Sequence, residues 1–124
     1  MLPFGVTFKP GLPVYEQVIY AVHKAIIAGK LSPGDAFPSV RALSKELKIN
    51  PNTALKIVAH LKQEGLLTVE PGRGTFINHD YSPTAKDKAE LLNETIEQLV
   101  VEARKLGLSK KAVQKSIEEH WDKL

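Results

Sequence analysis

The sequence predicts a mainly α-helical protein that carries a small β-hairpin. Two observations lead to this fold class. Apolar residues recur at helical spacing along most of the 124 residues, whereas one short stretch alternates like paired strands around a proline-glycine turn. Hydrophobic residues make up 43% of the chain and charged residues 25%, which is typical of a folded protein rather than a disordered one. The length suits one ordinary domain, or a small domain with an appendage.

The composition excludes several kinds of chemistry. The chain has no cysteine, so disulfides, thiolate zinc sites, iron–sulfur clusters and cysteine nucleophiles are ruled out. Its apolar stretches are only a few residues long, so we expect no membrane span. The first five residues lack the charged and apolar regions of a signal peptide. We therefore expect a cytoplasmic protein.

The first elements are an arm, a helix and a turn. Residues 1–13 contain three prolines and two glycines and are expected to form an extended arm. From Val14 the apolar residues follow helical spacing, and Gly29 ends the run. Residues 30–35 then form a turn cluster.

Two more helices follow, separated by a gap of three residues. Ser39 is a plausible N-cap for a short helix over 40–47. Asn50 caps the next helix, and Pro51 suits its first position. This helix is expected to reach about Glu64. Its inward-facing residues are Ala54, Ile57, Val58 and Leu61.

A hairpin completes the first part of the chain. Residues 66–70 alternate like a strand, 71–74 form a turn, and 75–78 form a second strand. The order of helix, short helix, turn, helix and hairpin is that of a winged helix-turn-helix. We assign this domain to residues 1–78.

Residues 79–83 read as a linker, and 84–124 as a two-helix tail. The first tail helix begins at about Thr84 and ends at Gly107, and Ser109 caps the second. Two helices of this length cannot enclose much core, so we expect a second copy to cover them in a dimer. The alternative is that the apolar stripe folds back on the winged domain. The expected dimer-interface residues are Leu92, Ile96, Leu99, Ala103, Leu106, Val113, Ile117 and Trp121.

Six segments, in order, resemble the N-terminal half of GntR-type transcriptional regulators. They are LPVYEQV (12–18), GKLSPGD (29–35), FPSVRAL (37–43), INPNT (49–53), EGLL (64–67) and GRGTF (72–76). The short two-helix tail is similar to the YtrA-type branch. That resemblance implies a small dimeric regulator, often encoded beside an ABC transporter.

The helix that begins after Asn50 is the expected reading helix. A helix presented end-on to the major groove needs short polar side chains in its first turn, which Asn50, Asn52 and Thr53 supply. Asparagine can pair with adenine, and threonine offers a hydroxyl and a methyl group. The plainer interpretation of Asn50 is a cap alone, and that of the other two is first-turn solvation.

Phosphate contacts are expected from Ser39, Arg41 and Lys56. Ser39 can both cap its helix and donate to phosphate, and Lys56 shares a helix face with Thr53. A guanidinium suits phosphate or guanine, and the resemblance implies that Arg41 contacts DNA. The plainer alternative is a solvated or salt-bridged arginine.

The expected wing tip is Gly72, Arg73, Gly74 and Thr75. Its glycines permit close backbone approach, and an arginine at a hairpin tip can enter a narrow minor groove. The alternative is a turn with an arginine that is merely exposed. A nucleotide-binding phosphate loop is excluded because no Gly-Lys-Ser/Thr follows and the next element is a strand.

The charge distribution agrees with a polyanion partner. Residues 1–78 carry nine Lys and Arg against five Asp and Glu, whereas 79–124 carry eight against nine. The four histidines are scattered, so we expect no metal site, no cofactor and no catalytic residues. The sequence thus predicts a sequence-specific DNA-binding regulator, a homodimeric repressor on an inverted-repeat operator. The alternative is a winged-helix protein-interaction module; the operator, the regulated genes and any small-molecule effector stay open.

Overall fold

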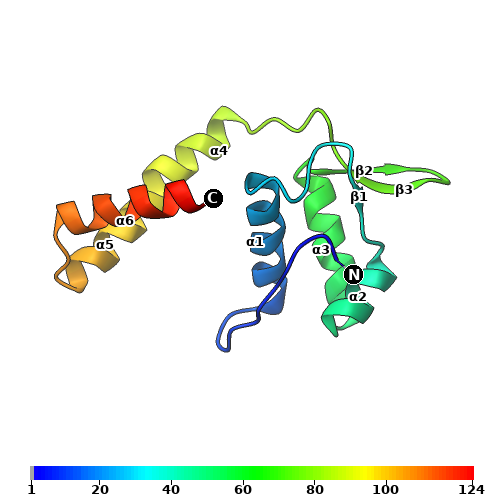
Figure 1. Cartoon of the computed structure of the whole chain (residues 1–124), viewed down its shortest axis with the longest axis horizontal. Coiled ribbons are helices and arrows are strands. Elements are labelled where there is room, and N and C mark those ends of the chain that lie inside the picture. The colour runs from blue at the N-terminus through cyan, green and yellow to red at the C-terminus, as the bar shows by residue number, and fades with distance from the viewer. Residues whose placement is uncertain (1) are drawn as a thin grey trace. The chain divides into compact units, whose positions relative to one another are not determined.

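The computed structural model describes residues 2–124 and divides into two compact units, one ending at Tyr81 and the other spanning Ser82–Leu124 (Figure 1). We call the first the winged domain and the second the tail. Each unit is described by itself below.

The winged domain combines three helices with a three-stranded sheet. The helices are α1 (Val14–Ile27), α2 (Val40–Leu47) and α3 (Pro51–Gln63), and the strands are β1 (Ala36–Phe37), β2 (Leu67–Glu70) and β3 (Gly74–Ile77). The strands are antiparallel in the order β1-β3-β2. This arrangement confirms the predicted winged helix-turn-helix.

Strand β1 is an element that the sequence analysis did not anticipate. It has only two residues, and it pairs Ala36 with Phe76 and Phe37 with Thr75. A strand this short carries no alternation of its own, so only its partner strand reveals it. It directs Phe37 into the core and carries the chain to the start of α2.

Local hydrogen bonds fix the ends of α2 and α3. The Oγ of Ser39 accepts a hydrogen bond from the backbone N–H of Ala42 at 3.1 Å, and the Oδ1 of Asn50 accepts one from the N–H of Asn52 at 2.7 Å. Both predicted N-caps are therefore confirmed. Lys48 ends α2 with φ 54°, in the left-handed region, and this reverses the chain into α3.

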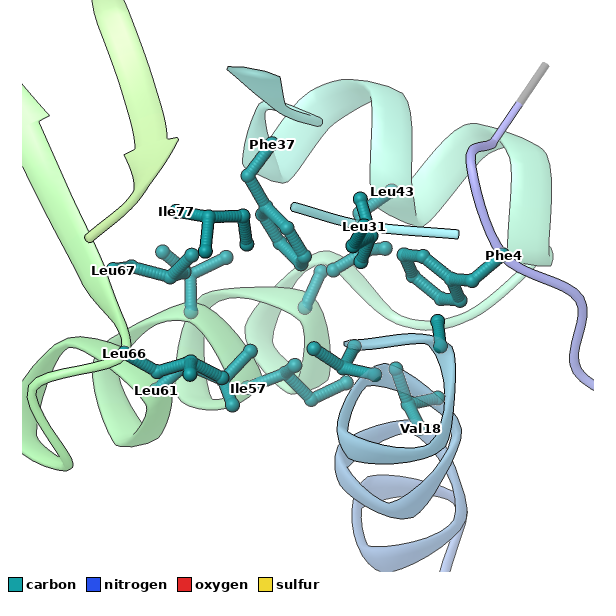
Figure 2. Packing of buried hydrophobic residues seen from close by; sticks show 14 residues of the cluster. Phe4, Val18, Leu31, Phe37, Leu43, Ile57, Leu61, Leu66, Leu67 and Ile77 are labelled. Carbon is teal, nitrogen blue, oxygen red and sulfur yellow. The ribbon is translucent and has the colours of Figure 1, made fainter. Parts of the chain in front are cut away.

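Among the described residues, a core of fourteen buried side chains holds the winged domain together (Figure 2). It draws on all three helices, the strands and the N-terminal arm. The described part of the arm, residues 2–13, forms no helix or strand, but Phe4 is buried and stacks on Phe37 with ring centroids 5.9 Å apart. The Gln17 amide also bonds to the backbone of Lys9 and Leu12. The predicted extended arm is therefore tied down on α1.

The tail contains α4 (Ala85–Glu90), the π-helical segment η1 (Leu91–Thr95), α5 (Ile96–Lys105) and α6 (Lys110–Lys123). The apolar spacing predicts a single regular helix from about Thr84 to Leu106, and the π-helical segment corrects this prediction. It adds width to one turn, a change that apolar spacing of three and four residues does not reveal. Gly107, with φ 75°, ends α5 as predicted, and Ser109 caps α6 through the N–H of Ala112 at 3.1 Å.

The tail, which the structure describes throughout, buries one hydrophobic side chain, that of Ala103. Val113 is half-buried, and the other six residues expected at an interface are exposed, with Trp121 at 80%. Ala103 is 6% exposed in the single chain, and its role at a dimer interface stays a prediction. Among the described residues, no helix has the length and apolar character needed to cross a membrane.

Candidate nucleic-acid interface

The first turn of α3 presents the predicted base-reading residues. Asn52 is exposed at the second position of the helix and Thr53 is half-buried at the third. Asn50 uses its Oδ1 for the cap, so its amide nitrogen keeps two N–H donors that a base edge or a phosphate can accept. The helix N-terminus adds its partial positive charge at the same place.

The helix α3 is held firmly behind this turn. Ala54, Ile57 and Leu61 lie on its buried face with no exposed surface, and α3 packs against α1, α2 and β2. Because the side chains that fix the helix are distinct from those that face outward, the polar first turn can meet a ligand without disturbing the core.

The expected phosphate-binding residues lie on the surfaces of α2 and α3. Ser39 and Arg41 are exposed at the start of α2, and Lys56 is exposed one turn into α3. The Oγ of Ser39 serves as the N-cap, and its hydroxyl hydrogen is not needed for that role. One serine hydroxyl can thus cap the helix and donate to an anion.

The wing tip is a tight turn. The N–H of Arg73 donates to the carbonyl of Glu70 at 2.9 Å, and Gly72 has φ 77°. Proline at the second position and a glycine with positive φ at the third are typical of a type II turn. Arg73 and the two flanking glycines are exposed, whereas Thr75 is half-buried and pairs with Val69 in the hairpin.

Arg73 has two partners that the sequence analysis missed. Its Nη1 lies 3.3 Å from one carboxylate oxygen of Glu70 and 3.4 Å from the other. Its Cζ lies 5.3 Å from the centroid of the Phe76 ring, in a cation–π contact. The turn signal was sufficient to find the first partner, because a type II turn brings its first and fourth residues together.

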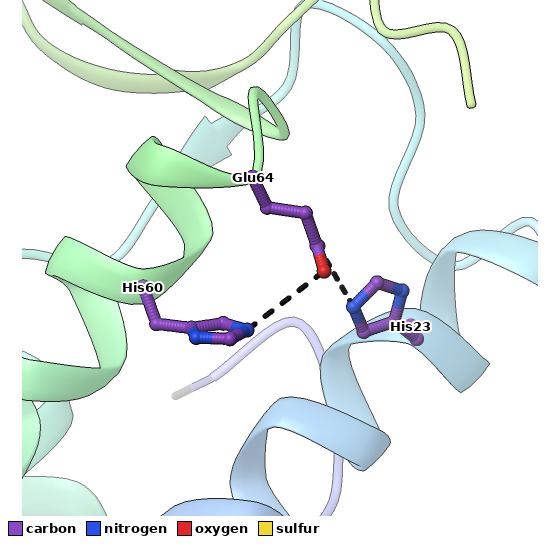
Figure 3. A network of polar contacts seen from close by, with 3 residues as sticks. All are labelled: His23, His60 and Glu64. Carbon is purple, nitrogen blue, oxygen red and sulfur yellow. Dashed lines mark ion pairs between the residues drawn. The ribbon is translucent and has the colours of Figure 1, made fainter. Parts of the chain in front are cut away.

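Two of the histidines meet at the C-terminal end of α3 (Figure 3). The Nε2 of His23, on α1, lies 2.9 Å from Oε1 of Glu64, and the Nε2 of His60 lies 3.8 Å from Oε2. Tyr15 packs edge-on against His60, with centroids 5.6 Å apart. Glu64 is the C-cap residue of α3, and its two carboxylate oxygens face the two imidazole rings.

The two histidines tie α1 to the end of α3 that lies farthest from the reading turn. The two imidazoles meet at Glu64 only because α1 packs on α3, and the positions of the histidines along the sequence do not reveal that packing. Within residues 2–124 no three His, Asp or Glu side chains are grouped so as to hold a metal ion.

Residues 14–77 match the sequence model described as "Bacterial regulatory proteins, gntR family". The "HTH-type transcriptional repressor YtrA" of Bacillus subtilis is 33% identical over 112 residues, which cover 90% of this chain and 86% of that protein.

Two solved structures extend the comparison. A protein described as a transcriptional antiterminator from Listeria monocytogenes EGD-e superposes with a TM-score of 0.83 at 26% identity, over 94% of this chain and 88% of that one. The DNA-binding domain of AraR, crystallised with its operator ORX1, gives a TM-score of 0.52 at 29% identity. It covers 59% of this chain and 94% of that one.

Proposed function

The chain belongs to the GntR family of bacterial regulatory proteins and carries its DNA-binding helix-turn-helix, and from this premise we propose that it is a repressor that binds an inverted-repeat operator as a homodimer. Its relatives are transcriptional regulators and not enzymes. The name of the Bacillus subtilis relative, a repressor, supports the direction of regulation. Because the proposed ligand is DNA, we also propose a cytoplasmic location.

The first turn of α3 is the observation that carries the proposal. Asn52 is exposed beside an Asn50 cap, at the positive end of a helix whose other face is locked into the core. In the helix-turn-helix docking geometry this turn faces base edges in the major groove. We assign base contacts to Asn50, Asn52 and Thr53.

Phosphate contacts are assigned to three exposed residues, Ser39, Arg41 and Lys56. The wing tip, Gly72 to Thr75, is assigned to the neighbouring minor groove, where Arg73 supplies the charge and the glycines permit close approach. The AraR DNA-binding domain, which is similar to the winged domain, was crystallised with its operator, and this supports DNA as the ligand.

The homodimer rests on the exposed apolar side chains of the tail. Leu92, Ile96, Leu99, Leu106, Ile117 and Trp121 are exposed in the single chain. Large apolar surfaces are usually covered by a partner, and helix-turn-helix dimers read half-sites one helical turn apart. We propose that a second tail covers these residues and sets the half-site spacing.

Two lysines on α3 provide a matched test of DNA binding. Lys56 lies near the reading turn and Lys62 in the last turn, and both are exposed. Lys56→Ala should weaken binding to all duplexes alike and reduce the slope of log affinity against log salt by about 1, whereas Lys62→Ala should change neither. Binding is measured on a random duplex and on a duplex enriched from a randomised pool by the unaltered protein, here called the selected duplex.

The base-reading assignment is tested by Asn52→Ala. This change should cost about 1–3 kcal/mol on the selected duplex, relax the preference at one base pair, and leave the random duplex almost unaffected. Failure of the unaltered protein to enrich any sequence would favour the alternative, a winged-helix module that binds another protein. Equal losses for Lys56→Ala and Lys62→Ala would contradict the docking orientation.

A further inference from the structure

The outer face of the wing gathers one acidic, one aromatic and one cationic side chain. In the β2–β3 register Glu70 lies opposite Gly74, and Thr68 lies opposite Phe76. Thr68 and Glu70 are two residues apart on β2 and share a face, and Phe76 shares that face because it lies directly opposite Thr68. Glu70 and Phe76 therefore lie on the same side of the hairpin, whereas Leu67 and Ile77 are buried on the other side. Gly74 has no side chain, so nothing of its own stands between Glu70 and Phe76 on that outer face.

Arg73 lies across this gap. The four-residue turn from Glu70 to Arg73 reverses the chain direction. The Nη1 of Arg73 lies 3.3 Å from a carboxylate oxygen of Glu70, and its Cζ lies 5.3 Å from the Phe76 ring centroid. The side chains of Arg73 and Glu70 are 70% and 46% exposed. The contact is therefore made at the surface, where a competing anion can reach it.

We propose that Glu70 competes with DNA for Arg73, so that the wing arginine has a resting position on Glu70 and Phe76 and leaves it when the duplex binds. This inference rests on the proposed DNA contact of Arg73. Glu70 is then a restraining residue, which lowers the affinity of the protein for DNA without touching a base.

The physical basis is an exchange of one anion for another. Arg73 can pair with a phosphate, or enter a narrow minor groove, only after it has left the carboxylate. The remaining Glu70 charge then lies close to the phosphates and repels them. An exposed ion pair contributes up to about 1 kcal/mol, and so the restraint corresponds to at most about a five-fold difference in affinity. Higher salt should diminish it, because exposed charges are screened.

The test removes the charge and keeps the shape. Glu70→Gln should tighten binding to the selected duplex by about three-fold at low salt, with a smaller gain at high salt. Glu16→Gln is the matched control, because it changes net charge by the same amount on α1, outside the wing. It should leave affinity nearly unchanged. Both variants should remain folded at the assay temperature, with Glu70→Gln unfolding at most a few degrees lower because it loses the ion pair with Arg73.

A double-mutant cycle ties the effect to the arginine. In an Arg73→Gln background most of the gain from Glu70→Gln should be lost, because the residue for which the two anions compete is gone and only the direct repulsion between Glu70 and the phosphates is left to relieve. A gain of equal size in both backgrounds, no gain at all, or weaker binding by Glu70→Gln would each overturn the inference.

The single variant Arg73→Gln distinguishes a failure of the Glu70 restraint from a failure of the proposed DNA contact. If Arg73→Gln weakens binding but Glu70→Gln does not tighten it, the DNA contact stands and the restraint falls. If Arg73→Gln has no effect on binding, both the wing contact and the restraint are wrong, whereas the α3 contacts are still judged by the Lys56 and Asn52 variants.

Discussion

The winged domain and the tail are both built from amphipathic helices, yet they treat their apolar residues in opposite ways. From residue 2 onward, the winged domain buries fourteen side chains in one cluster, whereas the tail buries only Ala103 among its hydrophobic residues and leaves Trp121 80% exposed. Apolar spacing alone therefore says that a face will be covered, but not by what. The winged domain covers its faces itself, and we propose that the tail is covered by a second copy.

The largest expected effect comes from shortening one leucine in each unit. Leu61 of α3 has no exposed surface, so Leu61→Ala should cost about 2–5 kcal/mol of unfolding free energy. Leu99 of α5 is 40% exposed, so Leu99→Ala should cost the winged domain less than about 0.5 kcal/mol.

Urea unfolding followed by circular dichroism measures the first effect, and sedimentation measures the weakened self-association expected of Leu99→Ala. Equal losses of unfolding free energy in the two variants would contradict the claim that only the winged domain covers its own apolar residues.

The second prediction separates the units. A chain that ends at Tyr81 keeps every residue of the core and should fold as a monomer. It should bind the selected duplex about 100-fold more weakly, because the second half-site is no longer held nearby. Sedimentation and gel-shift titration check the two outcomes. Fusion to an unrelated dimeric coiled coil should restore much of the affinity, and a truncated chain that still dimerises would refute the role of the tail.

Two serine caps with the same hydrogen-bond distance and spacing give the third prediction. Ser39 and Ser109 each accept a hydrogen bond at 3.1 Å from an N–H three residues on. Ser39→Ala should cost about 1 kcal/mol in the cooperative unfolding of the winged domain. Ser109→Ala should fray only the start of α6. Amide hydrogen exchange checks this: protection should fall throughout the winged domain for Ser39→Ala, and only near Ser109 for the tail variant.

The smallest effect concerns the capping box that begins the tail. Hydrogen bonds from the backbone and side chain of Thr84 lower the pKa of Asp87 below its ordinary value. The stabilisation is therefore fully present above the unfolded-state pKa, near pH 4, and is lost as the pH falls through the lower folded-state pKa. Thr84→Ala should raise the Asp87 pKa, which a carboxyl NMR titration measures. An unchanged pKa would show that the backbone N–H alone lowers it.

Most of the fold could be predicted from the sequence because its signals are local. The caps at Ser39 and Asn50, the hairpin turn and the stop at Gly107 each depend on residues within a few positions of one another, and the structure has all of them. Strand β1 could not be predicted, because it is a strand only through its pairing with β3, in which Ala36 lies opposite Phe76, forty residues away. The π-helical segment could not be predicted either, because its side chains are exposed and no buried apolar residue indicates the wider helical turn.

The candidate site divides in the same way. The first turn of α3 and the wing tip could be located from the sequence, because caps and turns specify where a helix begins and where a hairpin reverses. The His23–Glu64–His60 contact could not be located, since it joins α1 to α3 through tertiary packing. The Glu70–Arg73 pair lay within reach of the turn signal, although its cation–π partner Phe76 required the structure.

The placement of Trp121 has a practical consequence. It is the only tryptophan in the chain, and all three tyrosines, Tyr15, Tyr20 and Tyr81, belong to the winged domain. The two units therefore carry separate intrinsic fluorophores. Tryptophan emission reports the surroundings of the tail, and a partner that covers Trp121 should shift the emission to the blue and shield it from quenchers. Tyrosine emission follows the winged domain, so one unlabelled sample can report on each half of the molecule in turn.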